Sequence, residues 1–94
     1  MQMITFEVNL KHKKMDRSME EFVAYVIRNL VDSPEDVKID IFDGSKSSVV
    51  EIRVHDDDVA RLVGRQGRTI KALRQIAMTV AARLGRKVRL EIIQ

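Results

Sequence analysis

The spacing of the apolar residues constrains the fold of this chain more than any other feature, because helical spacing in some segments alternates with strand-like spacing in others. Between residues 18 and 30 the apolar residues recur at helical spacing, and between residues 37 and 54 two short segments alternate apolar and polar residues. Helical spacing returns on both sides of Gly64 and Gly67, and the segment after Gly85 alternates again. These periods distinguish amphipathic helices from half-buried strands, so the sequence predicts the order helix, strand, strand, helix, helix, strand.

Turn and capping residues set the expected ends of these elements. Ser18 and Glu21 have the spacing of a capping box, and Pro34 disfavours helical geometry at the residue before it. Gly85 is suited to a left-handed helix end. The expected elements are a helix over 18–30, a hairpin of strands over 37–42 and 50–54, a short helix over 57–63, a helix that follows Gly67 and runs to about residue 84, and a strand over 88–92. The two longer helices are expected to bury Met19, Phe22, Val23, Val26, Ile27, Leu30, Ile70, Leu73, Ala77, Val80, Ala81 and Leu84.

This order of elements predicts an α+β fold of two layers. Because two helices separate the second and last strands, those strands are expected to run parallel through a right-handed crossover. The result is a three-stranded mixed sheet with its helices on one face. With 94 residues, the chain is long enough for one such domain, which we expect over residues 15–94. Residues 1–14 stand apart as an amino-terminal extension that is either an edge strand or a flexible arm.

Composition narrows the classes of function. The chain has no Cys, which excludes disulfides and thiolate sites and suits a reducing cytoplasm. Its longest apolar run, from Phe22 to Ile27, is too short to cross a bilayer, so no membrane association is expected. The net charge of +3 divides unevenly: residues 59–94 hold nine basic side chains and one acidic one, whereas residues 1–58 hold eight and thirteen. A basic half of this kind attracts polyanions, although a solvated helix face would also account for it.

The segment Gly64-Arg65-Gln66-Gly67 joins the two carboxyl-terminal helices. Glycine permits a sharp turn and a close approach, and the amides at the start of the next helix can receive an anion. A lone G-x-x-G is a weak signal, but here it lies between amphipathic helices at the entrance to the basic half. We therefore expect this loop to bind phosphate.

The acidic run His55-Asp56-Asp57-Asp58 has two interpretations, a metal site or the start of a helix. Consecutive residues cannot all point at one ion, whereas Asp at a helix start accepts amide hydrogen bonds and complements the helix dipole. The sequence favours the helix start, and no metal or cofactor is expected. No catalytic constellation of Ser, His and acid is suggested, so an enzyme is not expected.

The run Val63-Gly64-Arg65-Gln66-Gly67-Arg68-Thr69-Ile70 resembles the signature of the KH family of nucleic-acid-binding domains, and the element order resembles its prokaryotic type II topology. Residues 16–94 are similar to the small stand-alone bacterial proteins of the KhpA type, which also resemble this chain at 30–35 and 88–92. The resemblance implies that the loop clamps the backbone of about four nucleotides of single-stranded RNA, with single-stranded DNA left open.

The resemblance also implies roles for individual residues. Ile70 is expected either to line the base-binding groove or to lie in the core. No aromatic stacking platform is evident, because Phe22 falls on the core stripe, Phe42 lies in a strand and Tyr25 is alone on the first helix, so sequence preference should be weak. The expected RNA-binding residues are Gly64, Arg65, Gln66, Gly67, Arg68, Ile70 and Lys71, together with Arg86 and Lys87 in the short variable loop.

A second strip on the long helix comprises Ala72, Ile76 and Thr79. It is either a dimer contact or a widened core face. KhpA-like proteins as a family self-associate and pair with a larger RNA-binding protein of the Jag type, which favours the contact. The expected function is that of an RNA-binding regulator or RNA chaperone, and the alternative is a KH-fold adaptor that acts mainly through a partner protein.

Overall fold

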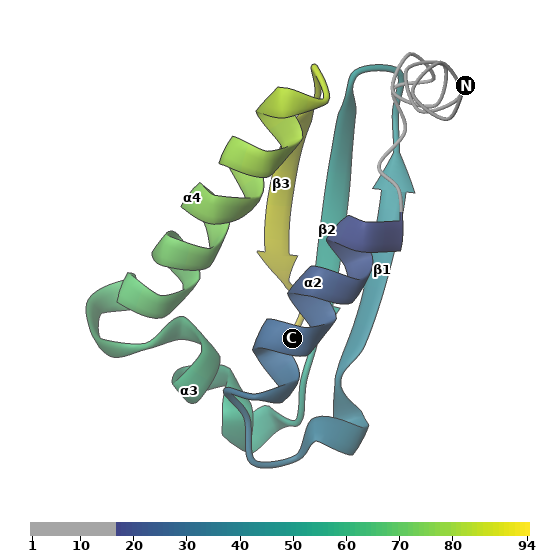
Figure 1. The fold of residues 1–94 in the computed structure, drawn as a ribbon. Coiled ribbons are helices and arrows are strands. Elements are labelled where there is room, and N and C mark those ends of the chain that lie inside the picture. Colours follow the sequence, from purple (N-terminus) through teal and green to yellow (C-terminus); the bar gives the residue numbers. More distant parts are fainter. Residues whose placement is uncertain (1–16) are drawn as a thin grey trace.

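The fold comes from a computed structural model, in which residues 17–94 are described; the predicted extension over 1–14 and the domain start at residue 15 lie outside them. The elements follow the predicted order, with 3₁₀ turns between some of them (Figure 1). They are α2 (Arg17–Arg28), a 3₁₀ turn (Pro34–Asp36), β1 (Lys38–Asp43), β2 (Ser47–Arg53), a 3₁₀ turn (Asp56–Asp58), α3 (Val59–Val63), a 3₁₀ turn (Arg65–Gly67), α4 (Arg68–Arg83) and β3 (Lys87–Ile92).

The three strands form one mixed sheet in the order β1-β2-β3. β1 and β2 are antiparallel, with Ile41 opposite Val50, and β2 and β3 are parallel, with Val50 opposite Leu90. Both α2 and α4 lie on the same face of this sheet, and α4 returns the chain from the end of β2 to the start of β3 (Figure 1). The predicted α+β class, mixed sheet and parallel crossover are confirmed.

The core lies between the helices and the sheet. Alternate residues of the strands and one stripe of each long helix face it, as the two side-chain periods require. Phe22 and Val80 were expected there, but they are 37% and 41% exposed, because both side chains face the groove between α2 and α4 and not the sheet. The most deeply buried apolar side chains are Val23, Ile27, Val50, Ile52, Leu62, Ala77, Ala81 and Leu90.

The helix ends agree with the sequence at one place and differ at another. Ser18, expected at the start of the first helix, is the second residue of α2, and this helix ends at Arg28 and not at Leu30. α4 ends as predicted: Gly85 has a φ of 70°, its N–H donates to the Ala82 carbonyl, and the Arg86 N–H donates to the Ala81 carbonyl, each at 3.0 Å. This pair of hydrogen bonds is a Schellman motif, which turns the chain directly into β3.

Within residues 17–94, none of the helices has both the length and the apolar character needed to span a membrane.

Candidate nucleic-acid interface

The Gly64–Gly67 loop reverses the chain between α3 and α4 within four residues. Three of the four have positive φ angles: 80° at Gly64, 57° at Gln66 and 74° at Gly67. The Gly64 N–H closes α3 on the Ala60 carbonyl at 2.9 Å, and the Gly67 N–H donates to the Gly64 carbonyl at 3.1 Å. The predicted sharp turn between two helices is confirmed.

The two glycines serve different purposes. Gly64 combines φ 80° with ψ 170°, a backbone region that essentially only glycine adopts. A Cβ on Gly64 would also lie 2.3 Å from Thr69 Oγ1 and 2.9 Å from the Thr69 backbone nitrogen. A Cβ on Gly67 would meet nothing closer than Lys71 Cε at 3.8 Å. Gly64 is therefore required by both conformation and space, whereas Gly67 is required only by its conformation.

Positive charge gathers where this loop meets α4. Arg65, Arg68 and Lys71 are exposed, and none of them forms an ion pair within residues 17–94. The Arg68 guanidinium only reaches Gln66 Oε1, at 3.5 Å. The positive end of the dipole of α4, a helix of 16 residues, lies at the same place. The structure thus brings together the loop and the three cations that the sequence singled out.

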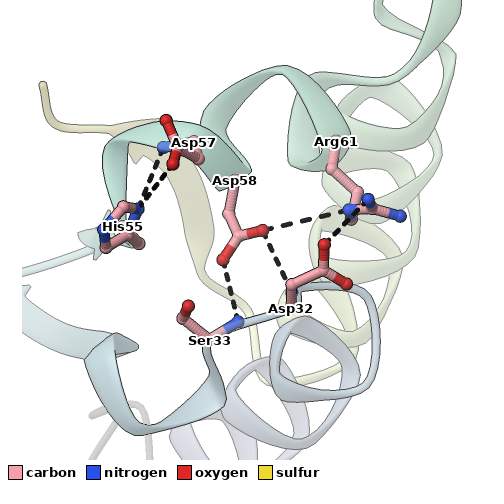
Figure 2. A network of polar contacts seen from close by, with 6 residues as sticks. All are labelled: Asp32, Ser33, His55, Asp57, Asp58 and Arg61. Carbon is pink, nitrogen blue, oxygen red and sulfur yellow. Dashed lines mark hydrogen bonds and ion pairs between the residues drawn. The ribbon is translucent and has the colours of Figure 1, made fainter.

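A buried carboxylate holds the helix before the loop in position (Figure 2). Asp58 is 2% exposed, and its carboxylate accepts hydrogen bonds from the backbone N–H groups of Asp32 and Ser33, each at 3.0 Å. The Asp32 N–H, followed by that of Ser33 and the charge of Arg61, holds the pKa of Asp58 below its usual value against the opposing effect of burial. Arg61 also donates to the Asp32 carboxylate at 3.0 Å. This network fastens α3 to the segment that follows α2.

The acidic run from His55 to Asp58 begins a helical segment, as expected, but the capping residue is not one of the aspartates. His55 is the capping residue, because its Nδ1 accepts the Asp57 N–H at 3.1 Å (Figure 2). Asp58 accepts amides from the distant segment after α2 and not from its own helix. Within residues 17–94, no group of three or more His and acidic side chains is arranged to hold a metal ion. Sequence reasoning missed the role of Asp58 because its partners are more than 20 residues away.

Arg86 does not have the role predicted for it. The residue is 3% exposed, and its guanidinium donates to the Gly44 and Ser47 carbonyls, each at 3.1 Å, and to Ser48 Oγ at 2.8 Å. It is also paired with the Asp43 carboxylate at 3.4 Å. The whole guanidinium is buried, including its Nε, which has no hydrogen-bond partner among the described residues, so RNA cannot reach it. Arg86 is therefore a structural residue that ties the β1–β2 turn to the start of β3.

The other predicted contacts divide between core and surface. Ile70 is 5% exposed and belongs to the core, as its second interpretation held, so it does not line a groove. Lys87 is exposed at the start of β3. Arg74 was not singled out, although it lies in the basic half at i+3 from Lys71; its Nε donates to the Leu90 carbonyl at 3.1 Å and links α4 to β3.

The second strip on α4 faces solvent. Ile76 is 48% exposed, and Ala72 and Thr79 are exposed as well. Ala72 and Ile76 line one wall of an apolar groove, whose other wall is formed by Phe22, Val26 and Leu30 of α2 and of the segment after it. Arg68 and Thr69 close one end of this groove, so it adjoins the Gly64–Gly67 loop.

Comparison with known proteins identifies the family. A family model described as KhpA/KhpB, KH domain matches residues 20–92. The RNA-binding protein KhpA of Chlamydia pneumoniae is 43% identical over 81% of this chain and 97% of its own length. The proteins of the same name from Halalkalibacterium halodurans and Clostridium perfringens are 41% and 37% identical, each over 80% of this chain and at least 99% of their own length. No solved structure matches the chain significantly. The chain therefore belongs to the KhpA/KhpB family of KH domains.

Proposed function

We propose that this protein binds single-stranded RNA and holds the RNA backbone at the Gly64–Gly67 loop. The observation that carries the proposal is the loop itself: a turn with three positive φ angles at the amino end of α4, flanked by three exposed cations without ion-pair partners in the described chain. The curated relatives, which are named as RNA-binding proteins, support RNA as the ligand. The action is that of a binding protein in the cytoplasm and not of an enzyme.

Each loop residue has a role in this proposal. Gly64 and Gly67 let the backbone turn so that a phosphate approaches without meeting a Cβ. Arg65 and Gln66, at the tip, contact the phosphates by charge and by hydrogen bond. Arg68 and Lys71 add positive charge along the first turns of α4, where the helix dipole already favours an anion. In KH domains such a loop clamps about four nucleotides, and few base contacts mean a weak sequence preference. These properties suit a post-transcriptional regulator or RNA chaperone.

The experiment measures fluorescence anisotropy of a short unstructured RNA with the wild type and with Arg65→Asp/Gln66→Asp. Both glycines remain, so the fold is retained while two carboxylates face the phosphates. The matched control, Lys38→Asp/Gln94→Asp, alters the net charge equally at exposed positions outside the loop. We expect loss of binding only in the loop variant, and a wild-type salt slope of about −0.7 per phosphate contacted. Equal binding by both variants would refute the loop as the clamp.

The apolar groove favours a second function, pairing with another protein chain. Ile76 and Phe22 are large apolar side chains that remain 48% and 37% exposed across the groove between α4 and α2. We propose that Ala72, Ile76 and Thr79 belong to a homodimer contact, and that the same face serves an adaptor role toward a Jag-type RNA-binding protein. Because the groove reaches Arg68, a partner chain seated in it would lie beside the Gly64–Gly67 loop.

Sedimentation equilibrium of Ile76→Asp tests the dimer. We expect the variant to be a folded monomer, because a carboxylate in the contact would be desolvated without a partner. Met78→Asp is the matched control, since Met78 is 51% exposed on α4 but does not line the groove shared with α2. If Ile76→Asp is folded and keeps the wild-type molar mass, the dimer proposal fails.

A further inference from the structure

The face of the sheet turned away from the helices carries an exposed aromatic side chain. Ile39 and Ile41 of β1 pack toward the core, so Phe42 points to the opposite face, where it is 56% exposed. The strand register places Val49 directly opposite Phe42 and Arg89 opposite Val49. None of the described helices covers this face (Figure 1). An aromatic ring and a partly exposed valine thus form an open platform beside a cation.

Positive charge surrounds this platform at the end of the sheet nearest the β1–β2 turn. Lys46 lies in the turn, and its carbonyl accepts the backbone N–H of Lys87, so the two lysines lie close to each other. Neither lysine has a carboxylate within ion-pair distance in the described chain, whereas Arg89 is paired with Glu91 at 2.8 Å. Beside the platform, a cleft of about 560 Å³ is lined by Val49, Lys87 and Arg89 on the sheet side and by Met78 and Ala82 on the α4 side, whereas Phe42 and Lys46 do not line it.

The next row of side chains on the same face is acidic. Asp40 lies opposite Glu51, and Glu51 lies opposite Glu91. Arg53 is paired with Asp40 at 3.2 Å and with Glu51 at 3.6 Å, and Glu91 is paired with Arg89, so each carboxylate of this row has a cationic partner. Lys46 and Lys87, at the turn end, have none among the described residues, so the unpaired positive charge that attracts a polyanion lies at that end of the face.

We propose that Phe42, Val49, Lys46, Lys87 and Arg89, here named the Phe42 surface, form a second contact for single-stranded nucleic acid. A base stacks on the Phe42 ring, and the neighbouring phosphates lie beside Lys46 and Lys87. This inference rests on the proposed RNA binding and extends it. Aromatic platforms flanked by basic side chains bind single strands in this way, whatever the base.

The distance between the two contacts makes the proposal testable by RNA length. α4 has 16 residues and runs from the Gly64–Gly67 loop toward the β1–β2 turn, so the contacts lie about 24 Å apart along the helix axis (Figure 1). A strand of about four nucleotides fills the loop alone. A strand of about twelve nucleotides is expected to engage both contacts and to bind more tightly.

The experiment titrates both RNA lengths with Phe42→Leu, which keeps an apolar side chain and removes the ring. We expect about a tenfold weaker affinity for the longer RNA and no change for the shorter one, because a stacked base contributes about that much. A 2-aminopurine base in the longer RNA should lose its quenching with the same variant. Tyr25→Leu is the control, since Tyr25 is an exposed aromatic residue on α2, and it should change neither affinity.

Three results would overturn the inference: unchanged binding of the longer RNA by Phe42→Leu, equal weakening of both lengths, or equal weakening by Tyr25→Leu. Thermal unfolding of Phe42→Leu must show a folded protein at the temperature of the titration. Failure of the proposed function would look different. In that case the wild type would bind neither RNA, or Arg65→Asp/Gln66→Asp would bind the RNA as tightly as the wild type does.

Discussion

Arg86 and Lys87 are neighbours in sequence, but their mutation is expected to affect different properties. Loss of Arg86 should lower stability, whereas loss of Lys87 should lower RNA affinity. The Arg86 guanidinium is buried, donates hydrogen bonds to the β1–β2 turn and is paired with Asp43. Lys87 is exposed and has no ion-pair partner within residues 17–94. Replacing each residue by Ala therefore separates a structural basic residue from a ligand-binding one within the same short connection.

The expected loss of stability in Arg86→Ala follows from its contacts. Removing one partner of a buried ion pair costs about 3–5 kcal/mol. The Asp43 side chain is 29% exposed, so water can solvate its carboxylate in part once Arg86 is removed. We therefore take the low end of this range, about 3 kcal/mol, as the expected loss of unfolding free energy. Because 1 kcal/mol shifts the Tm of a domain of 60–100 residues by about 4–8 °C, the Tm should fall by about 12–24 °C. Lys87→Ala should change stability by no more than about 0.5 kcal/mol.

The assay combines thermal unfolding with RNA anisotropy at a low temperature, where both variants are folded. Arg86→Ala should bind about twelve nucleotides of RNA as the wild type does. Lys87→Ala should bind it more weakly, with a salt slope reduced by about 0.7 for one lost phosphate contact. A Tm of Arg86→Ala within about 3 °C of the wild type, or weaker RNA binding by folded Arg86→Ala than by Lys87→Ala, would refute this reasoning.

Two further predictions concern the loop and its support. Gly64→Ala places a Cβ 2.3 Å from Thr69 Oγ1 and should weaken RNA binding more than tenfold in anisotropy titrations. Gly67→Ala has space for its Cβ and meets only the conformational cost of its positive φ, about 1–2 kcal/mol, so it should weaken binding less. Equal losses of RNA affinity in the two variants would contradict the distinction. Because the folded-state pKa of Asp58 lies below its unfolded value, its contribution to stability is complete above the unfolded pKa and is lost as the pH falls through the folded pKa. Urea unfolding should therefore show that the stability gap between wild type and Asp58→Asn is largest near neutral pH and narrows below about pH 4, and a constant gap would count against it.

Much of the fold was predictable because its signals are local. Apolar periodicity distinguished helices from strands within about ten residues, and the two intervening helices implied the parallel crossover. Gly85 could be recognised as a helix end from its position alone, since a left-handed residue after a helix favours glycine. The G-x-x-G segment was recognisable for the same reason: its four residues make the turn by themselves.

Errors arose where distant segments decide the outcome. Phe22 and Val80 occupy the expected helix stripes, yet the width of the groove between α2 and α4 leaves them partly exposed. The strand that contains Phe42 was predicted, but the exposure of the Phe42 ring was not. The ring is accessible because none of the described helices packs on the outer face of the sheet (Figure 1). The period of an element predicts which side chains share a face, and it does not predict what covers that face.

The sequence by itself determined the order of elements, the mixed sheet, the loop and the family resemblance, because periodicity and glycine positions act over a few residues. Only the tertiary structure decided which basic residues remain available to a ligand. Arg86 and Lys87 cannot be told apart by composition, and they diverge because the β1–β2 turn, about 40 residues earlier, surrounds one guanidinium with carbonyls. Asp58 likewise became the support of α3 because the segment after α2 presents two N–H groups to it. Burial and hydrogen bonding depend on neighbours brought together by folding, so these roles are set by the packed chain as a whole.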